Sequence, residues 1–347
     1  MRRAAQSIRN LPRIGCAVAA CAAALFVAAA AQAAVPDTML AVGYDRGGGP
    51  EVLTLHHLPV PKPNAGEVLI AVHATGVNVW EAASRQHAGS DTPFPVIPGS
   101  DGSGTIAALG SGVRDFKIGD EVYARGRAFY AEYTVARAED VAHIPKGISL
   151  TEAGILATSG LSALQGIDDT LRLKAGETLI IHGASGAVGT LAVQFARLRG
   201  ARVLATATTA EGLALVSHLG AEVAVNGQSD DIVAAARRFA PDGVDAVLGF
   251  AGGEALEHCI DALRHDGRGR VAYLYGMEPL PRPRFGMSMT LYSFIAGEGE
   301  FARLNAAVEA AKLRVPIAAE YPLADAAEAH RRLQAAHLLG KIVLRVH

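Results

Sequence analysis

The chain has 347 residues, of which 50% are hydrophobic and 19% are charged. This length predicts two domains, and the composition excludes disorder, which needs low hydrophobicity and high net charge. The formal net charge is −2 and the sequence has no run of five basic residues, which excludes a nucleic-acid-binding surface of the usual basic kind. Three cysteines are too few for a disulfide framework or a four-cysteine zinc site.

The N-terminus has the pattern of a secretory signal peptide. Four arginines precede an uncharged stretch over residues 14–31, and Ala31-Gln32-Ala33 fits an A-x-A cleavage site. We therefore expect residues 1–33 to be a signal peptide, the protein to be periplasmic or secreted, and no stable membrane association after cleavage. Three alternatives stay open: a retained membrane anchor, a lipoprotein cleavage box at Cys21, and a translation start at Met39 that would give a cytoplasmic protein.

Residues 39–155 have the pattern of a β-rich domain. Strands are expected within residues 67–73, 102–112 and 116–123, and they are separated by glycine-rich turns and by loops that contain proline. Short strands and tight turns of this kind predict a small barrel-like domain.

From Leu156 the hydrophobic period changes to that of alternating strands and helices. Strands are expected at residues 178–182, 202–206, 223–225, 246–248 and 271–273. Two of the intervening helices are expected to end at Gly200 and Gly220. This alternation predicts a doubly wound parallel sheet over residues 156–287. Residues 288–347 are expected to return to the first domain and to end in a strand over residues 340–345.

The turn His182-Gly-Ala-Ser-Gly-Ala-Val-Gly189 joins a buried strand to an amphipathic helix. Gly186 would let the backbone approach a pyrophosphate, and Gly189 would let helix and strand pack closely. The helix N-terminus offers free N–H groups to phosphate. Ala184 stands where the usual pattern has its first glycine. The turn predicts a dinucleotide site, and the alternative is a tight turn without a ligand.

The end of the following strand indicates which dinucleotide binds. An NAD site usually has a carboxylate about 20 residues after the turn, and this position falls near Ala207. Thr206, Thr208 and Thr209 surround it, with no acidic residue before Glu211. An uncharged, hydroxyl-rich pocket tolerates a 2′-phosphate, so the sequence favours NADPH. No lysine or arginine follows closely, and the threonines could instead only suit the end of a strand.

Several further motifs occur in the order expected of one family. They are Met39–Leu53, Ala74–Asn78, Pro98–Asp101, Tyr130–Tyr133, Gly160–Ala163 and Gly340–Leu344. Together with the glycine turn, they resemble the zinc-free quinone oxidoreductase (zeta-crystallin-like) branch of the medium-chain dehydrogenase/reductase superfamily. The resemblance implies an α/β protein with a GroES-like β-rich catalytic domain, a Rossmann domain with a doubly wound parallel sheet, a cofactor cleft between them, and a homodimer.

The resemblance also implies which residues bind the cofactor. Those expected are Asn78 and Ser162 at the nicotinamide, Ala184, Ser185, Gly186, Ala187 and Val188 at the pyrophosphate, Thr206 and Thr208 at the 2′-phosphate, and Phe250, Tyr275, Gly276 and Lys341 elsewhere in the cleft. The chain departs from the family in two ways. Ala83 stands where an aromatic residue is common, five positions after the family asparagine, and the basic residue after the second strand is missing.

No metal site is expected. A zinc alcohol dehydrogenase needs cysteine or histidine near position 78 and a His-Glu pair where Ser100 and Asp101 stand. Cys259 is expected to be a core residue, because its neighbours have the spacing of an apolar helix face.

Without a Lewis acid, hydride transfer requires an acceptor that is already electrophilic. The sequence therefore predicts an NADPH-dependent oxidoreductase whose small-molecule electron acceptor is a quinone or the activated C=C bond of an enone or enal. No catalytic residue is assigned. Tyr130 is a candidate proton donor, although aromatic packing explains it equally well. The alternative functions are a zinc-type alcohol or aldehyde oxidoreductase and a non-catalytic NADPH-binding protein.

Overall fold

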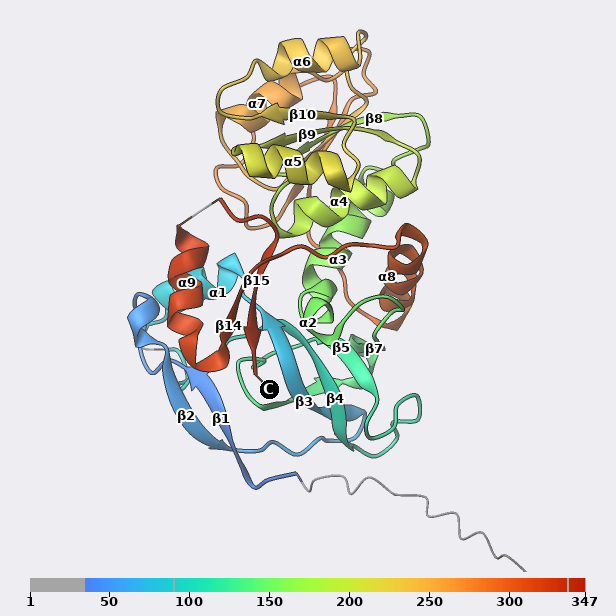
Figure 1. Cartoon of the computed structure of the whole chain (residues 1–347). Helices are drawn as coiled ribbons and strands as arrows, with labels where there is room; N and C mark the ends of the chain where they lie inside the picture. Colours follow the sequence, from blue (N-terminus) through green and yellow to red (C-terminus); the bar gives the residue numbers. More distant parts are fainter. Residues whose placement is uncertain (1–34, 90, 336, 347) are drawn as a thin grey trace, which may run out of the picture. The chain divides into compact units, whose positions relative to one another are not determined.

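Two large β-sheets of different kinds organise the chain (Figure 1). The computed structural model describes residues 35–89, 91–335 and 337–346, so the expected signal peptide lies outside the described residues. From Val35 onward the chain forms one unit. Its helices are α1 (Val79–Gln86), α2 (Leu150–Ala153), α3 (Leu156–Gln165), α4 (Ala187–Leu198), α5 (Ala210–Leu219), α6 (Ile232–Phe239), α7 (Glu254–Asp261), α8 (Glu298–Ala311) and α9 (Ala326–Gln334).

The first sheet is mainly antiparallel and belongs to the β-rich part of the chain. Its strands are β3 (Glu67–Gly76), β4 (Asp101–Leu109), β5 (Glu121–Arg125), β6 (Tyr133–Arg137), β7 (Val141–His143), β14 (Ile317–Pro322) and β15 (Lys341–Arg345). Their order is β14-β15-β3-β4-β5-β7, and β6 also pairs with β3. A separate hairpin joins β1 (Thr38–Gly43) to β2 (Thr54–Pro59). The pairing of Val343 with Gly76 confirms that the C-terminal strand returns to the first domain.

The second sheet is parallel and has six strands among the described residues. They are β8 (Thr178–His182), β9 (Arg202–Ala207), β10 (Val223–Asn226), β11 (Ala246–Gly249), β12 (Arg270–Leu274) and β13 (Ser288–Tyr292). Their order is β10-β9-β8-β11-β12-β13, which is the doubly wound order. In such sheets ligands bind where the strand order reverses, which is between β8 and β11 here. The expected domain end at residue 287 is wrong, because β13 belongs to this sheet.

Successive side chains of each parallel strand point to opposite faces of this sheet, and both faces are buried. Leu179 and Ile181 of β8 pack in one core with α4 and α5, whereas Ile180 packs in a second core with α6 and α7. Helices therefore cover both faces, and Figure 1 shows the two helix pairs on opposite sides of the strands. Gly220 ends α5 with φ of 115°, a conformation that favours glycine. This packing fixes the ends of β8, β9 and β11, where the candidate site lies.

None of the helices in residues 35–346, leaving out the undescribed positions 90 and 336, is both long enough and apolar enough to span a bilayer.

Candidate functional site

The turn between β8 and α4 has one open glycine and one closely packed glycine. A Cβ atom at Gly186 would meet only the carbonyl oxygen of Gly183, at 3.5 Å, which is an ordinary contact. A Cβ atom at Gly189 would lie 2.4 Å from that same oxygen and 2.6 Å from Cα of Ala184. The two glycines therefore have different roles: Gly189 allows the helix to pack on the turn, whereas the protein's own packing does not explain Gly186.

A cavity of about 510 Å³ opens at this turn. The expected residues that line it are Ser185, Gly186, Ala187, Val188, Thr206, Thr208, Phe250 and Lys341. Residues of the β-rich part, among them Val77 and Trp80, also line it, as do further residues of the parallel-sheet part such as Gln228 and Ala255. The backbone N–H of Gly340, which precedes β15, donates to the carbonyl of Ser185 at 2.9 Å. The cavity is thus built from the glycine turn on one side and from α1 and β15 on the other.

Five of the expected residues do not line the cavity: Asn78, whose contacts follow below, and Ser162, Ala184, Tyr275 and Gly276. Ala184 and Ser162 are buried, and the carbonyl of Ser162 accepts a hydrogen bond from the Tyr292 hydroxyl. Tyr275 is 73% exposed and, like Gly276, is not among the lining residues. The last four of these residues do not line this cavity, and their expected contacts with a cofactor stay predictions.

Asn78 lies directly behind the wall, at the start of α1, and all its amide atoms have partners. Its Nδ2 donates to Glu81 Oε1 at 3.0 Å and to Asp101 Oδ1 at 3.2 Å. Its Oδ1 accepts a hydrogen bond from the Lys341 ammonium group. Asn78 thereby joins a cation at the cavity wall to two buried carboxyl groups.

Burial shifts the ionisation of this cluster. The pKa of Lys341 is lowered by desolvation, while the charges of Asp101 and Glu81 oppose this shift. The pKa of Glu81 is raised by desolvation, and its hydrogen bonds with Asn78 oppose that. The two carboxyl groups therefore support a positively charged lysine at a site where burial alone would favour the neutral amine.

Trp80 is a cavity residue that the sequence reasoning missed. It is 39% exposed, and its indole Nε1 donates to Ser100 Oγ at 2.9 Å. The Ser100 hydroxyl in turn donates to Glu81 Oε1 at 2.8 Å. Ala83, which stands where the family often has an aromatic residue, is exposed and does not line the cavity. The signal that could have found Trp80 is an aromatic residue two positions after Asn78, whereas the family's aromatic position falls at Ala83.

The end of β9 differs from the expectation in detail. The Thr206 hydroxyl is buried and lies 2.8 Å from His182 Nδ1, so its hydrogen bond is made within the protein. Thr208 is exposed, and its hydroxyl lies 2.9 Å from Nδ1 of His337, which also lines the cavity. A basic side chain thus reaches this end from a loop 129 positions away, which no local sequence pattern could indicate.

Tyr130 is not at the cavity. It is fully buried, and its hydroxyl donates to Glu81 Oε2 at 3.0 Å and lies 3.1 Å from His330 Nε2. Burial raises the pKa of this hydroxyl well above its ordinary value. The interpretation of Tyr130 as a proton donor to the acceptor is therefore wrong, and the same holds for packing against the cofactor.

The donor atoms at Asn78 and Ser100 do not fit catalytic zinc, which prefers thiolate, imidazole and carboxylate ligands. The amide of Asn78 is fully hydrogen bonded, and its oxygen already accepts from the Lys341 side chain. Within the described ranges, no three His, Cys, Asp or Glu side chains are grouped so that they could hold a metal ion. Cys259 is fully buried, which confirms its expected place in the core.

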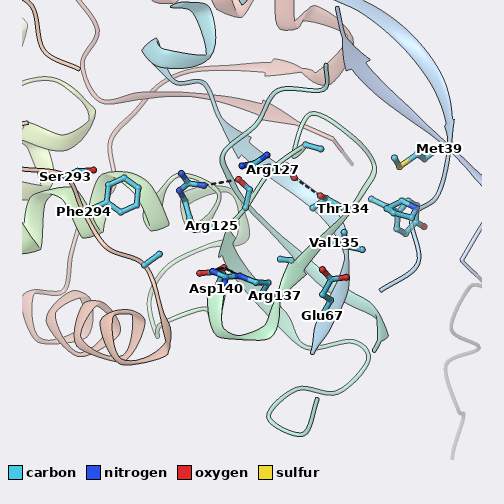
Figure 2. A pocket seen from close by; sticks show the side chains of 16 residues that line it. Met39, Glu67, Arg125, Arg127, Thr134, Val135, Arg137, Asp140, Ser293 and Phe294 are labelled. Carbon is cyan, nitrogen blue, oxygen red and sulfur yellow. Dashed lines mark hydrogen bonds and ion pairs between the residues drawn. The ribbon is translucent and has the colours of Figure 1, made fainter. Parts of the chain in front are cut away.

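A second and larger cavity, of about 740 Å³, lies elsewhere on the β-rich part. Figure 2 shows Arg125, Arg127 and Arg137 around it, with Phe294 on one side. Arg137 is paired with Asp140 at 2.6 Å. None of the expected cofactor residues lines this cavity, so its size alone does not make it the candidate site.

Comparison with known proteins gives two family matches. Residues 64–146 match the model of the alcohol dehydrogenase GroES-like domain, and residues 219–344 match the model named zinc-binding dehydrogenase. The human quinone oxidoreductase is 33% identical over 88% of this chain and 97% of its own length. The chloroplastic NADPH-dependent alkenal/one oxidoreductase of Arabidopsis thaliana is 31% identical over 90% of this chain and 81% of its own length.

Solved structures show the same similarity. A mycobacterial protein complexed with NADPH is 29% identical, with a TM-score of 0.78 over 89% of this chain and all of that one. An NAD-dependent alcohol dehydrogenase is 31% identical, with a TM-score of 0.82 over the same shares. These matches confirm the expected pair of a GroES-like β-rich sheet and a Rossmann-like parallel sheet. The chain belongs to the medium-chain dehydrogenase/reductase superfamily, among the oxidoreductases related to quinone oxidoreductases.

Proposed function

We propose that this protein is an NADPH-dependent oxidoreductase that reduces quinones, or the activated C=C bonds of enones and enals, without zinc. The observation that carries the proposal is the open face of Gly186, at the start of α4 and in the wall of a cavity that also contains Lys341. The names of two similar proteins, a quinone oxidoreductase and an alkenal/one oxidoreductase, support the choice of acceptor.

The chain has suitable groups for each part of the cofactor. The free N–H groups at the start of α4, at Ala187 and Val188, suit a pyrophosphate. The end of β9 carries no carboxylate, and Thr208 with His337 offers hydrogen bonds to a 2′-phosphate. Bound NADPH would supply the hydride. These features favour NADPH over NADH, because an acidic side chain at this place would repel the extra phosphate.

Lys341 is the group best placed to assist the acceptor. Its ammonium carries three hydrogens, of which one is donated to Asn78. The other hydrogens can be donated to a carbonyl oxygen that gains negative charge as the acceptor is reduced. A hydrogen bond polarises a carbonyl less than a metal ion does, so the acceptor has to be conjugated. Quinones, enones and enals meet this requirement, whereas unactivated alcohols and their aldehydes do not.

The test is a panel of acceptors with the purified protein, before and after exhaustive chelation. We expect NADPH oxidation with a naphthoquinone or an enal, little with a saturated aldehyde, and no loss after chelation. Stoichiometric zinc together with chelator-sensitive alcohol oxidation would instead support the zinc-type alternative. NADPH binding without turnover of any acceptor would support a non-catalytic binding protein.

A further inference from the structure

Trp80 presents an aromatic surface to the cavity beside the glycine turn. It is 39% exposed although it is the only tryptophan of the chain and one of its largest apolar side chains. Exposed apolar surface is unfavourable in water, at about 25 cal/mol per Å². An aromatic ring that stays open inside a cavity is therefore suited to a ligand that covers it.

The orientation of this ring is fixed from behind. Its only polar atom, Nε1, donates to Ser100 Oγ, and the Ser100 hydroxyl donates to the buried Glu81 carboxyl group. The indole is thus anchored at one edge by a chain of two hydrogen bonds. Such anchoring keeps the ring in one orientation before a ligand arrives, which lowers the entropy cost of stacking.

The surroundings of the ring indicate the chemistry of the ligand. The Lys341 Nζ atom lies over the ring, 5.6 Å from its centroid. A planar ligand stacked on this ring would find a hydrogen-bond donor for an oxygen at its edge. The neighbours Val77 and Val79 are apolar cavity residues. An aromatic face with apolar neighbours and one cation fits a planar, uncharged, conjugated carbonyl compound.

We propose that Trp80 is the residue on which the acceptor ring stacks, and that it makes this enzyme prefer ring-shaped quinones to small acyclic enals. This inference rests on the proposed function and narrows its acceptor class. Aromatic stacking contributes about 1 kcal/mol beyond simple burial, which corresponds to about a fivefold change in affinity. Trp80 is therefore a specificity-determining residue, whereas Lys341 is the group that faces the acceptor oxygen.

The first test compares Trp80→Ala and Trp80→Phe with 1,4-naphthoquinone and with acrolein. We expect Trp80→Ala to raise KM for naphthoquinone about fivefold and to change KM for acrolein and for NADPH less than about twofold. Trp80→Phe, which keeps a ring, should stay close to the wild type. Ile118→Ala, at a 46% exposed apolar residue outside both cavities, is the matched control. If Trp80→Ala does not fold, Trp80→Leu replaces it, because leucine keeps apolar volume without a ring.

Equal loss with both acceptors, or a raised KM for NADPH, would assign Trp80 to the cofactor or to the fold and overturn the inference. Unchanged KM values would overturn it as well. Failure of the wild type with every acceptor would instead reject the proposed function itself, and this result is distinguishable because it does not involve the variants.

A second test needs no turnover. Because Trp80 is the only tryptophan, intrinsic fluorescence at tryptophan wavelengths reports on this ring alone. In the presence of NADP⁺, naphthoquinone should quench it along a saturable curve with a midpoint close to KM. A free tryptophan derivative under the same conditions should show only linear, collisional quenching. Linear quenching of the protein would mean that the quinone does not rest on Trp80.

Discussion

Lys341 and Asn78 are 263 positions apart in the sequence, yet the ammonium group of one donates a hydrogen bond to the side-chain oxygen of the other. Lys341 begins the last strand of the β-rich sheet, and Asn78 caps the first helix. Both side chains are buried, at 7% and 1% exposure. The contact joins the start of β15 to the N-terminus of α1, and it places the amino group of Lys341 at the wall of the candidate site.

Replacing Lys341 should destabilise the protein. Lys341→Met leaves the Asn78 oxygen without its donor and leaves two buried carboxyl groups, Glu81 and Asp101, without the neighbouring cation. Removing one partner of a buried charged group costs about 3 kcal/mol. We expect the free energy of unfolding of Lys341→Met, measured in urea, to fall by about this amount. Lys117→Met, at an 86% exposed lysine, should change little. An unchanged midpoint in Lys341→Met would contradict the charged interpretation.

The two glycines of the turn should respond differently to alanine. Gly186→Ala meets no atom closer than 3.5 Å, so the variant should fold with wild-type stability and yet bind NADPH at least about tenfold more weakly, or 1.4 kcal/mol. Gly189→Ala puts a Cβ 2.4 Å from the Gly183 oxygen and should lower the thermal midpoint. Calorimetric titration and thermal unfolding of both variants test this. Wild-type affinity in Gly186→Ala would mean that no ligand backbone or phosphate approaches this glycine.

Local patterns in the sequence were sufficient to predict the parallel sheet but not its last strand. The strands β8 to β12 are short apolar runs between helices, and each was expected within two residues. The strand β13, Ser288–Tyr292, has one buried side chain, that of Tyr292, and follows a proline-rich segment. An edge strand of this kind lacks the hydrophobic signal on which the prediction relied.

The same limit explains the errors at the candidate site. Four residues expected from the glycine turn, Ser185 to Val188, line the cavity, because strand, turn and helix are contiguous in the sequence. His337 and Trp80 reach the cavity from other elements, and only the tertiary packing brings them there. Ser162 and Tyr130 were expected at the cleft, but their side chains face the core, and a sequence motif does not reveal which face a residue takes.

Cofactor preference should depend on charge at the end of β9. Ala207 lines the cavity next to Thr208. Ala207→Asp would place a carboxylate where the 2′-phosphate is expected, so the NADPH-to-NADH ratio of kcat/KM should fall at least about tenfold. Ala207→Asn has the same size without the charge and is the matched control. A wild type that already prefers NADH, or an equal fall in Ala207→Asn, would reject the electrostatic explanation.

Acid should destabilise the protein through two buried histidines. Burial lowers the pKa of His182 and of His330 to about 4, from an ordinary value of 6.5. Below pH 6.5 these histidines are therefore protonated in the unfolded chain but stay neutral in the folded chain. Their contribution to the free energy of unfolding is fully present above pH 6.5 and is lost as the pH falls toward 4. Between about pH 7.5 and pH 5, each histidine should account for about 2 kcal/mol.

Urea unfolding of His330→Gln at both pH values tests this explanation. The variant should lose about 2 kcal/mol less than the wild type on acidification. His57→Gln, at an exposed histidine, should behave like the wild type. A pH dependence that is the same in all three proteins would show that other groups cause the acid sensitivity.

We infer that the protein forms a homodimer through the β13 edge of the parallel sheet. Within residues 35–89, 91–335 and 337–346 this strand pairs with β12 alone. Its other side therefore offers backbone groups that no described strand pairs with, and soluble proteins usually cover such an edge. Large apolar side chains in this strand and just before and after it in the sequence are exposed: Leu291 of β13 is 44% exposed, Ile295 71% and Phe285 103%. In a dimer with a two-fold axis at this edge, the β13 edges of the two copies would cover each other, together with their apolar side chains, because each copy offers the same surface to the other.

Light scattering after gel filtration measures the mass directly, and we expect twice the chain mass for the wild type. Leu291→Lys puts a charge into the expected interface and should give a monomer that keeps its fold. Leu55→Lys, at a 52% exposed leucine on β2, introduces the same charge far along the sequence from the patch and should leave the mass unchanged. If the wild type is a monomer, the apolar edge at β13 is not an interface between copies. A dimer that persists in Leu291→Lys would mean that the two copies meet through another surface.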